Sequence, residues 1–175
     1  KGSITSFSTS DDMDMTVGDA TPAYLGQLTM ARRAVVYLRP HIVLVFDALE
    51  SIQARKWEWN LHAVNKFVQT DSKTLLAKNA DAQVCVHFES SSPTIFRQSN
   101  AFTAPPTRTK GDARPDQWHG QFLANDASTR FWSVAVMNVG CLPMAPDVVF
   151  NRDTATARIN GRIFEFDSNK ITMKY

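Results

Sequence analysis

The chain has 175 residues, of which 43% are hydrophobic and 21% are charged, so it is long enough to bury one core and has an ordinary globular composition. Nineteen basic and seventeen acidic residues give a formal net charge of +2, which argues against a nucleic-acid partner. No apolar run approaches the roughly 18 residues of a membrane span, so a membrane partner is not expected either.

Short segments rich in β-branched and aromatic residues recur between Gly, Pro, Asn, Asp and Ser, and no long segment has helical periodicity. The first clear elements are residues 27–38 and 42–49, which predict a long hairpin closed by the turn Arg39-Pro40-His41. Residues 42–46 are apolar on both alternating faces, which indicates a strand that is covered on two sides.

Residues 55–62 alternate in character, with Trp57, Trp59 and Leu61 on one face. This pattern predicts a half-buried strand with its aromatic side chains inward and its polar side chains outward. Further strands are predicted at residues 66–70, 74–78, 83–88, 117–123 and 130–137.

The segment 98–116, which is rich in Pro, Thr and basic residues, is predicted to be a long irregular loop. Residues 156–159 and 162–166 flank Asn160-Gly161, a dipeptide typical of a type I′ hairpin turn. Residues 167–169 then reverse the chain into a last strand at 171–175. We therefore predict an all-β fold, an antiparallel two-layer β-sandwich that forms a single domain over residues 1–175.

Sequence motifs of self-sufficient catalytic sites are absent, which leaves individual polar residues as the candidates for a functional role. Asp47 and His62 could share a metal or a proton if they lay close together. If their strands form a simple hairpin, four to five residues at about 3.3 Å each separate them by roughly 13 to 17 Å. We therefore expect Asp47 to accept local backbone hydrogen bonds, and His62 to be an outward polar residue.

For three other polar features we expect structural or solvent-facing roles and not functional ones. His87 is expected to be structural or solvent-facing, and Asp11-Asp12-Met13-Asp14 is expected to be a solvated turn because it lacks the calcium-loop pattern. Arg32-Arg33 places one guanidinium on each face of a strand, so the inward one should form an ion pair.

Trp118-His119-Gly120 directly follows the long polar loop. An aromatic ring and an imidazole at such a junction could stack on a sugar and bind its hydroxyl groups, although a core tryptophan is the alternative. Trp118, His119 and the outward His62 are the candidate substrate-binding residues. We expect no catalytic residue, no metal site and no cofactor in this chain.

Neither the N-terminal residues nor the two cysteines show in which cellular compartment the protein is found. The start, Lys1-Gly2-Ser3-Ile4, has no initiator Met and no signal-peptide core, so we interpret it as a cut end. Cys85 and Cys141 are too few for a zinc ribbon or a disulfide scaffold. One bridge in an oxidising compartment and two free thiols both remain open.

The order of several features resembles the β-sandwich of the heparinase II/III-like polysaccharide lyases over roughly residues 2–63. The features are Gly18-Asp19-Ala20, Tyr24, Arg32-Arg33 before Val35-Val36, Val45-Phe46-Asp47, and Trp57-x-Trp59-x-Leu61-His62. The resemblance implies a periplasmic or secreted protein in which a helical toroid precedes the sandwich and uronate-containing polysaccharide is cleaved by β-elimination. It also implies that the catalytic and metal-binding residues lie ahead of the matched portion.

The leading hypothesis is accordingly a non-catalytic scaffold that lends one wall to a glycan cleft and is joined to an upstream helical domain. One alternative is an independent carbohydrate-binding module that uses Trp118, His119 and the loop 98–116. Another is a structural β-sandwich of a secreted protein, which would self-associate through exposed strand edges.

Overall fold

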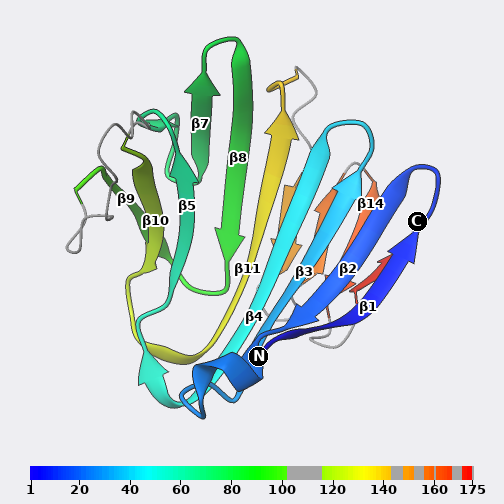
Figure 1. Ribbon diagram of the computed structural model, residues 1–175, viewed down its shortest axis with the longest axis vertical. Helices are drawn as coiled ribbons and strands as arrows, with labels where there is room; N and C mark the ends of the chain where they lie inside the picture. The colour runs from blue at the N-terminus through cyan, green and yellow to red at the C-terminus, as the bar shows by residue number, and fades with distance from the viewer. Residues whose placement is uncertain (102–115, 143–147, 152–155, 160, 167–170, 175) are drawn as a thin grey trace, which may run out of the picture.

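The computed structural model describes residues 1–101, 116–142, 148–151, 156–159, 161–166 and 171–174. These residues form antiparallel strands in three sheets and one short 3-10 helix, η1 (Thr21–Tyr24), which confirms the all-β prediction (Figure 1). Sheet A has the strand order β1 (Ser3–Thr9), β2 (Met13–Asp19), β3 (Met30–Leu38), β4 (Ile42–Arg55), β11 (Ser128–Val139), β8 (Ala82–Ser90), β7 (Thr74–Asn79), β6 (Val68–Gln69).

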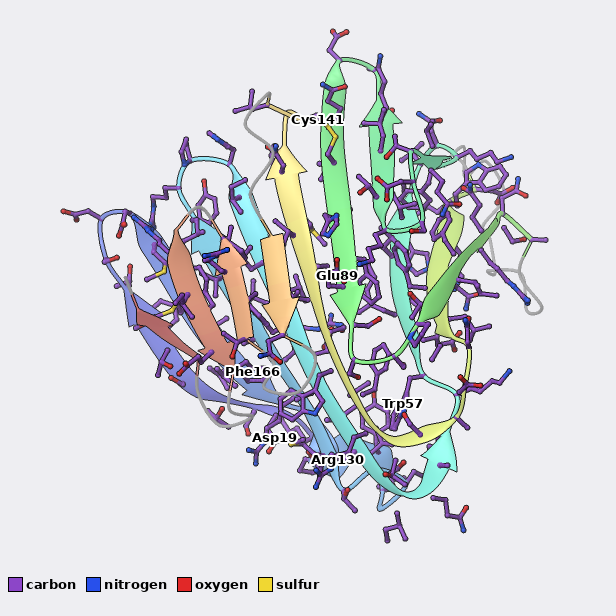
Figure 2. All side chains as sticks on the ribbon, turned by 180° about the vertical axis from the view of Figure 1, so that it is seen from behind. Asp19, Trp57, Glu89, Arg130, Cys141 and Phe166 are labelled. Carbon is purple, nitrogen blue, oxygen red and sulfur yellow. A yellow bond between two sulfur atoms is a disulfide. The ribbon has the colours of Figure 1, made fainter. Side chains whose placement is uncertain are left out.

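Two smaller sheets pack on sheet A. Sheet B has the order β5 (Glu58–Ala63), β10 (Trp118–Ala124), β9 (Thr94–Ser99), and sheet C has the order β12 (Val148–Asn151), β13 (Thr156–Ile159), β14 (Arg162–Phe166), β15 (Ile171–Lys174). Sheet C lies in front of the β2–β4 side of sheet A in Figure 2, and sheet B lies toward the β7 and β8 side. The two small sheets therefore cover opposite faces of sheet A, over different halves of it.

The two small sheets pack against opposite faces of strand β4. Its residues Ile42, Leu44, Phe46 and Ala48 face the core between sheets A and C. Alternate residues of the same strand, including Val43, Val45 and Leu49, face the core between sheets A and B. The prediction of a strand covered on two sides is confirmed, and the two-layer sandwich becomes three layers at the centre.

Most of the predicted strands are present. β3 and β4 form the expected hairpin, with Leu38 opposite Ile42. β13 and β14 also form a hairpin, in which Ile159 lies opposite Arg162 and Gly161 has a positive φ of 78°. Asn160 and the turn 167–169 lie outside the described residues, although β15 pairs with β14 as expected.

The sequence analysis missed some strands, and one hairpin that it predicted does not form. β1, β2, β9 and β12 were not predicted, and β2 includes Met13 and Asp14, which had been assigned to a turn. β4 and β5 do not pair as a simple hairpin, because β4 continues to Arg55 and β5 belongs to sheet B. The distance inferred from that hairpin therefore has no basis. The predicted loop 98–116 overlaps the end of β9, and residues 102–115 lie outside the described part.

Cys85 and Cys141 form a disulfide, which resolves the alternative that the sequence left open. Cys85 lies on β8, and Cys141 follows the end of β11, where Figure 2 shows it beside the neighbouring strand. The bridge joins two adjacent strands of sheet A across 56 residues of chain. It therefore links the C-terminal end of β11 to β8 in the middle of sheet A.

Replacing both cysteines by serine should lower the free energy of unfolding by about 2–4 kcal/mol, because the unfolded chain regains the entropy of an open loop. Urea unfolding followed by tryptophan fluorescence measures the change. A reducing agent should destabilise the unmodified protein by a similar amount and leave the double variant unaffected. Equal midpoints for the variant and the unmodified protein would show that the bridge contributes no stability.

Gly120, on strand β10 of sheet B, packs closely against aromatic and aliphatic side chains of the core. A Cβ atom built at this position would lie 2.9 Å from Cε2 of Phe67 and 3.1 Å from both Leu61 Cδ2 and Phe96 Cε2. At Gly18, also in a strand, the nearest atom would be 3.7 Å away. Only the first position therefore requires glycine for steric reasons.

We expect Gly120→Ala to destabilise the protein by about 1–3 kcal/mol through overpacking. Gly18→Ala, the matched control, should be neutral or stabilise the protein by up to about 1 kcal/mol, because it reduces the entropy of the unfolded chain. Thermal and urea unfolding of the two variants provide the comparison. Similar stabilities for both would contradict the close packing described for Gly120.

Candidate functional site

A cleft of about 640 Å³ with convergent polar groups lies between the edge strand β5 of sheet B and the part of sheet A that sheet B leaves uncovered. Its lining includes residues of the N-terminus and of η1, two segments that lie at the foot of the molecule in Figure 1. Its polar and charged lining consists of Ser3, Asp19, Tyr24, Arg32, Arg33, Asp47, Glu58 and Asn60. Trp59, Phe131 and Leu49 supply apolar lining.

Asp47 organises the floor of the cleft. It lies directly opposite Arg33 in the ladder between β3 and β4, and the Arg33 Nε and Nη2 groups donate to its two carboxylate oxygens over 2.7 and 3.0 Å. The Trp59 indole, which comes from sheet B, donates a third hydrogen bond to Asp47 Oδ2 over 3.0 Å. One buried carboxylate therefore ties the two sheets together.

This arrangement corrects one prediction and confirms another. Asp47 was expected to accept backbone hydrogen bonds, but its partners are side chains, because its strand face turns toward sheet B. The prediction of an ion pair for the tandem arginines is confirmed, since Arg33 pairs with Asp47 and Arg32 pairs with Asp19 over 3.1 Å.

Arg33 is the more accessible half of its ion pair. The side chain of Arg33 is 55% exposed, whereas that of Asp47 is 8% exposed. Burial tends to lower the pKa of Arg33, but hydrogen bonds and charge attraction from Asp47 outweigh it and raise that pKa above the usual value. The guanidinium therefore presents fixed N–H groups to the cleft while its charge is matched by the carboxylate beneath it.

A short turn positions Tyr24 at the wall of the cleft. Asp19 Oδ1 accepts a hydrogen bond from the Thr21 backbone N–H, and Thr21 Oγ1 accepts one from the Ala31 backbone N–H, both over 2.8 Å. Hydrogen bonds from Thr21, and then from Arg32, lower the pKa of Asp19, so this anchor stays ionised. Tyr24, at the end of η1, remains partly exposed and offers an aromatic surface to a ligand.

The opposite wall is the outward edge of β5. Glu58 and Asn60 are exposed, whereas Trp59 between them is buried, as the alternation in the sequence predicted. The Gln121 side chain, on the neighbouring strand β10, donates a hydrogen bond of 2.6 Å to Glu58 Oε2. Two hydrogen-bonding side chains of one strand therefore border the cleft at a spacing of two residues.

The same strand leads from the cleft to the predicted histidines. His62 and His119 lie opposite each other in the β5–β10 ladder, and His119 Nδ1 is 2.6 Å from His62 Nε2. One ring must donate and the other accept, so the accepting nitrogen carries no proton. Trp118 turns to the other face of β10, packs against the core between sheets A and B, and has the Lys66 ammonium 5.4 Å from its ring centre.

The structure thus brings two of the three predicted binding residues together and separates the third. The sequence analysis did not identify Tyr24, Arg33, Glu58 and Asn60 as site residues. The sequence contained a signal for Arg33. In the predicted hairpin of residues 27–38 and 42–49, Arg33 lies directly opposite Asp47 and on the same face of the sheet. No signal in the sequence placed Tyr24 or the β5 edge beside that pair, because β5 pairs with a strand about 60 residues away.

His87 has a structural environment, in line with its prediction. It contacts Thr74 Oγ1 over 3.2 Å and Glu89 Oε1 over 3.1 Å, and Lys73 donates to the same carboxylate. In the part of the chain that the structure describes, no group of three or more His, Cys, Asp or Glu side chains could hold a metal ion. No helix among the same residues is long and apolar enough to span a membrane.

No protein-family model matches the chain, and no curated protein matches it in sequence. Solved structures do share its fold. A heparinase III structure aligns with 99% of this chain at a TM-score of 0.66 and 13% identity, and a second heparinase III structure aligns with 98% at 0.65 and 12%. The heparan sulfate lyase HepC from Pedobacter heparinus aligns with 99% at a TM-score of 0.60 and 13% identity.

The chain spans about a quarter of the length of these structures, 27% of each heparinase III chain and 28% of HepC. The resemblance predicted from the sequence is therefore confirmed at the level of the fold, and it extends beyond residues 2–63 to nearly the whole chain.

Asp47→Asn tests the floor of the cleft. The amide keeps the shape of the side chain but opposes one of the N–H donors with its own NH2 group, so the free energy of unfolding should fall by about 1.5–3 kcal/mol. Urea unfolding monitored by tryptophan fluorescence measures this change in stability. The control Asp126→Asn, at an exposed turn, should change stability by less than about 0.5 kcal/mol. Equal effects of the two substitutions would contradict the role assigned to Asp47.

Proposed function

We propose that this chain is the β-sandwich part of a heparinase II/III-like polysaccharide lyase and forms one wall of its glycan cleft without catalysing the reaction alone. The observation that carries the proposal is the convergence of Tyr24, Arg33, Glu58 and Asn60 on one cleft, in a chain whose whole length aligns with heparinase III structures. An aromatic surface beside fixed hydrogen-bonding groups is the usual composition of a sugar-binding cleft.

The charge pairing in the cleft supports a non-catalytic role. β-Elimination at a uronate requires a group that neutralises the carboxylate, a base for the C5 proton and an acid for the leaving oxygen. Arg32 and Arg33 are each engaged with a carboxylate of the same chain, so their charges are already matched. We propose that the catalytic groups come from the rest of the protein, including a helical domain that precedes this one in the chain.

His62 and His119 extend the proposed binding surface. They lie beyond Glu58 and Asn60 along β5, so an extended glycan that leaves the cleft along this strand would pass the imidazole pair. A substrate-binding role is proposed for these two histidines. Trp118 is not included, because its indole packs inward against the core.

The disulfide is compatible with an oxidising compartment, which supports a periplasmic or secreted location.

An independent carbohydrate-binding module is the second candidate function, and the same cleft favours it. The two functions differ in whether the complete protein cleaves a polysaccharide.

The test measures both the cleavage and the binding of three polysaccharides: heparan sulfate, hyaluronan and alginate. The complete protein should release unsaturated uronate products, detected by ultraviolet absorbance, and the 175-residue chain should bind a glycan without releasing any. Asn60→Ala should weaken that binding about three- to tenfold, because a hydrogen bond to a sugar is lost. Asn125→Ala, at an exposed turn away from the cleft, should leave the affinity unchanged.

Turnover by the 175-residue chain alone would overturn the non-catalytic role. Binding by the chain, with no cleavage of any of the three polysaccharides by the complete protein, would favour the independent binding module.

A further inference from the structure

The charges that line the cleft are almost completely matched within the chain. Three carboxylates and two guanidiniums line it, so the described lining has a net charge of −1. Arg32 pairs with Asp19, and Arg33 pairs with Asp47 through two hydrogen bonds. Because each guanidinium already lies against a carboxylate, neither contributes an unmatched positive charge that would attract an anionic sugar.

Glu58 is the carboxylate left over from this pairing. Among the residues that the structure describes, Glu58 accepts a hydrogen bond at Oε2 from the neutral amide of Gln121 and forms no ion pair. Its side chain is exposed at the edge of β5 and borders the cleft beside Asn60. The unmatched negative charge of the cleft therefore lies where a ligand would enter.

We propose that the cleft takes a neutral or amino sugar and disfavours a uronate or sulfated one, and that Glu58 determines this preference. The inference rests on the proposed function, since it assumes that the cleft binds glycan. In a polysaccharide that alternates uronate with hexosamine, the hexosamine would lie against this wall. The uronate carboxylate would then be recognised by groups outside this cleft.

The negative charge of Glu58 acts differently on sugars of different charge. A sugar ammonium near Glu58 is attracted by its carboxylate, a sugar carboxylate or sulfate is repelled by it, and a hydroxyl can donate a hydrogen bond to it. Because Glu58 is exposed, solvent and salt screen these interactions, and the preference should be modest and sensitive to ionic strength.

Three hexasaccharides with the same β-1,4 linkage separate the effect of the charge on the sugar from the effect of the linkage. Cellohexaose is neutral, the hexamer of glucosamine carries amines, and the hexamer of glucuronic acid carries carboxylates. Calorimetric titration of the 175-residue chain with each gives the affinities. The NMR signal of the Trp59 indole N–H, which donates to Asp47 in the floor of the cleft, reports whether the sugar occupies the cleft.

At low ionic strength the glucosamine hexamer should bind about fivefold more tightly than cellohexaose, and the glucuronic acid hexamer should bind most weakly. Glu58→Gln, which keeps the shape and can still accept from Gln121, should bring the three affinities to within about twofold of one another. Asp81→Asn makes the same change in charge at the exposed β7–β8 turn and should leave the preference intact. Added salt should reduce the preference of the unmodified protein.

Two negative outcomes are distinguishable. If the hexamers shift the Trp59 signal but the glucuronic acid hexamer binds most tightly, or if Glu58→Gln changes nothing, the assignment to Glu58 is wrong and the cleft remains a glycan site. If none of the three hexamers binds or shifts the Trp59 signal, the role of the cleft in the proposed function fails, and this inference fails with it.

Discussion

The interaction on which the site depends is the three-way contact of Asp47 with Arg33 and Trp59. Arg33 comes from the neighbouring strand of the same sheet, whereas Trp59 comes from the sheet packed above it, so one buried carboxylate fixes both the register and the distance between layers. A buried charge is tolerated only when its oxygens are satisfied by donors, and here three N–H groups satisfy them. The same contact holds the floor of the cleft beneath the edge of β5.

The layer arrangement explains why a cleft exists at that place. Sheet A is wide, and sheets B and C each cover part of one of its faces. As a result, β4 and β11 are enclosed, β2 and β3 keep one face largely open, and β1 is exposed on both faces. The edge strand of sheet B ends above that open face and supplies Glu58 and Asn60 as one wall. An open sheet face beside the polar edge of another sheet suits an extended polymer more than a small enclosed ligand.

Several features of the fold could be predicted from local patterns. The β3–β4 hairpin and the enclosed central strand follow from the turn at Pro40 and from the apolar run at residues 42–46. β1 was missed because it is fully exposed and carries no strict alternation between apolar and polar residues. β2 was missed because its first residues, Met13 and Asp14, belong to an acidic segment that was assigned to a turn. The simple β4–β5 hairpin was wrong because the sequence does not reveal that the chain changes sheets after Arg55.

The sequence by itself determined the class of fold, the faces of the strands and the need for an ion-pair partner for one of the two tandem arginines, because these depend on side-chain alternation and on the cost of burying a charge. Only the tertiary structure decided which carboxylate is that partner, that the cysteines are bridged, and that His62 faces His119. Each of these contacts joins segments from different strands, and pairing between distant strands depends on how the sheets stack, which no local spacing encodes.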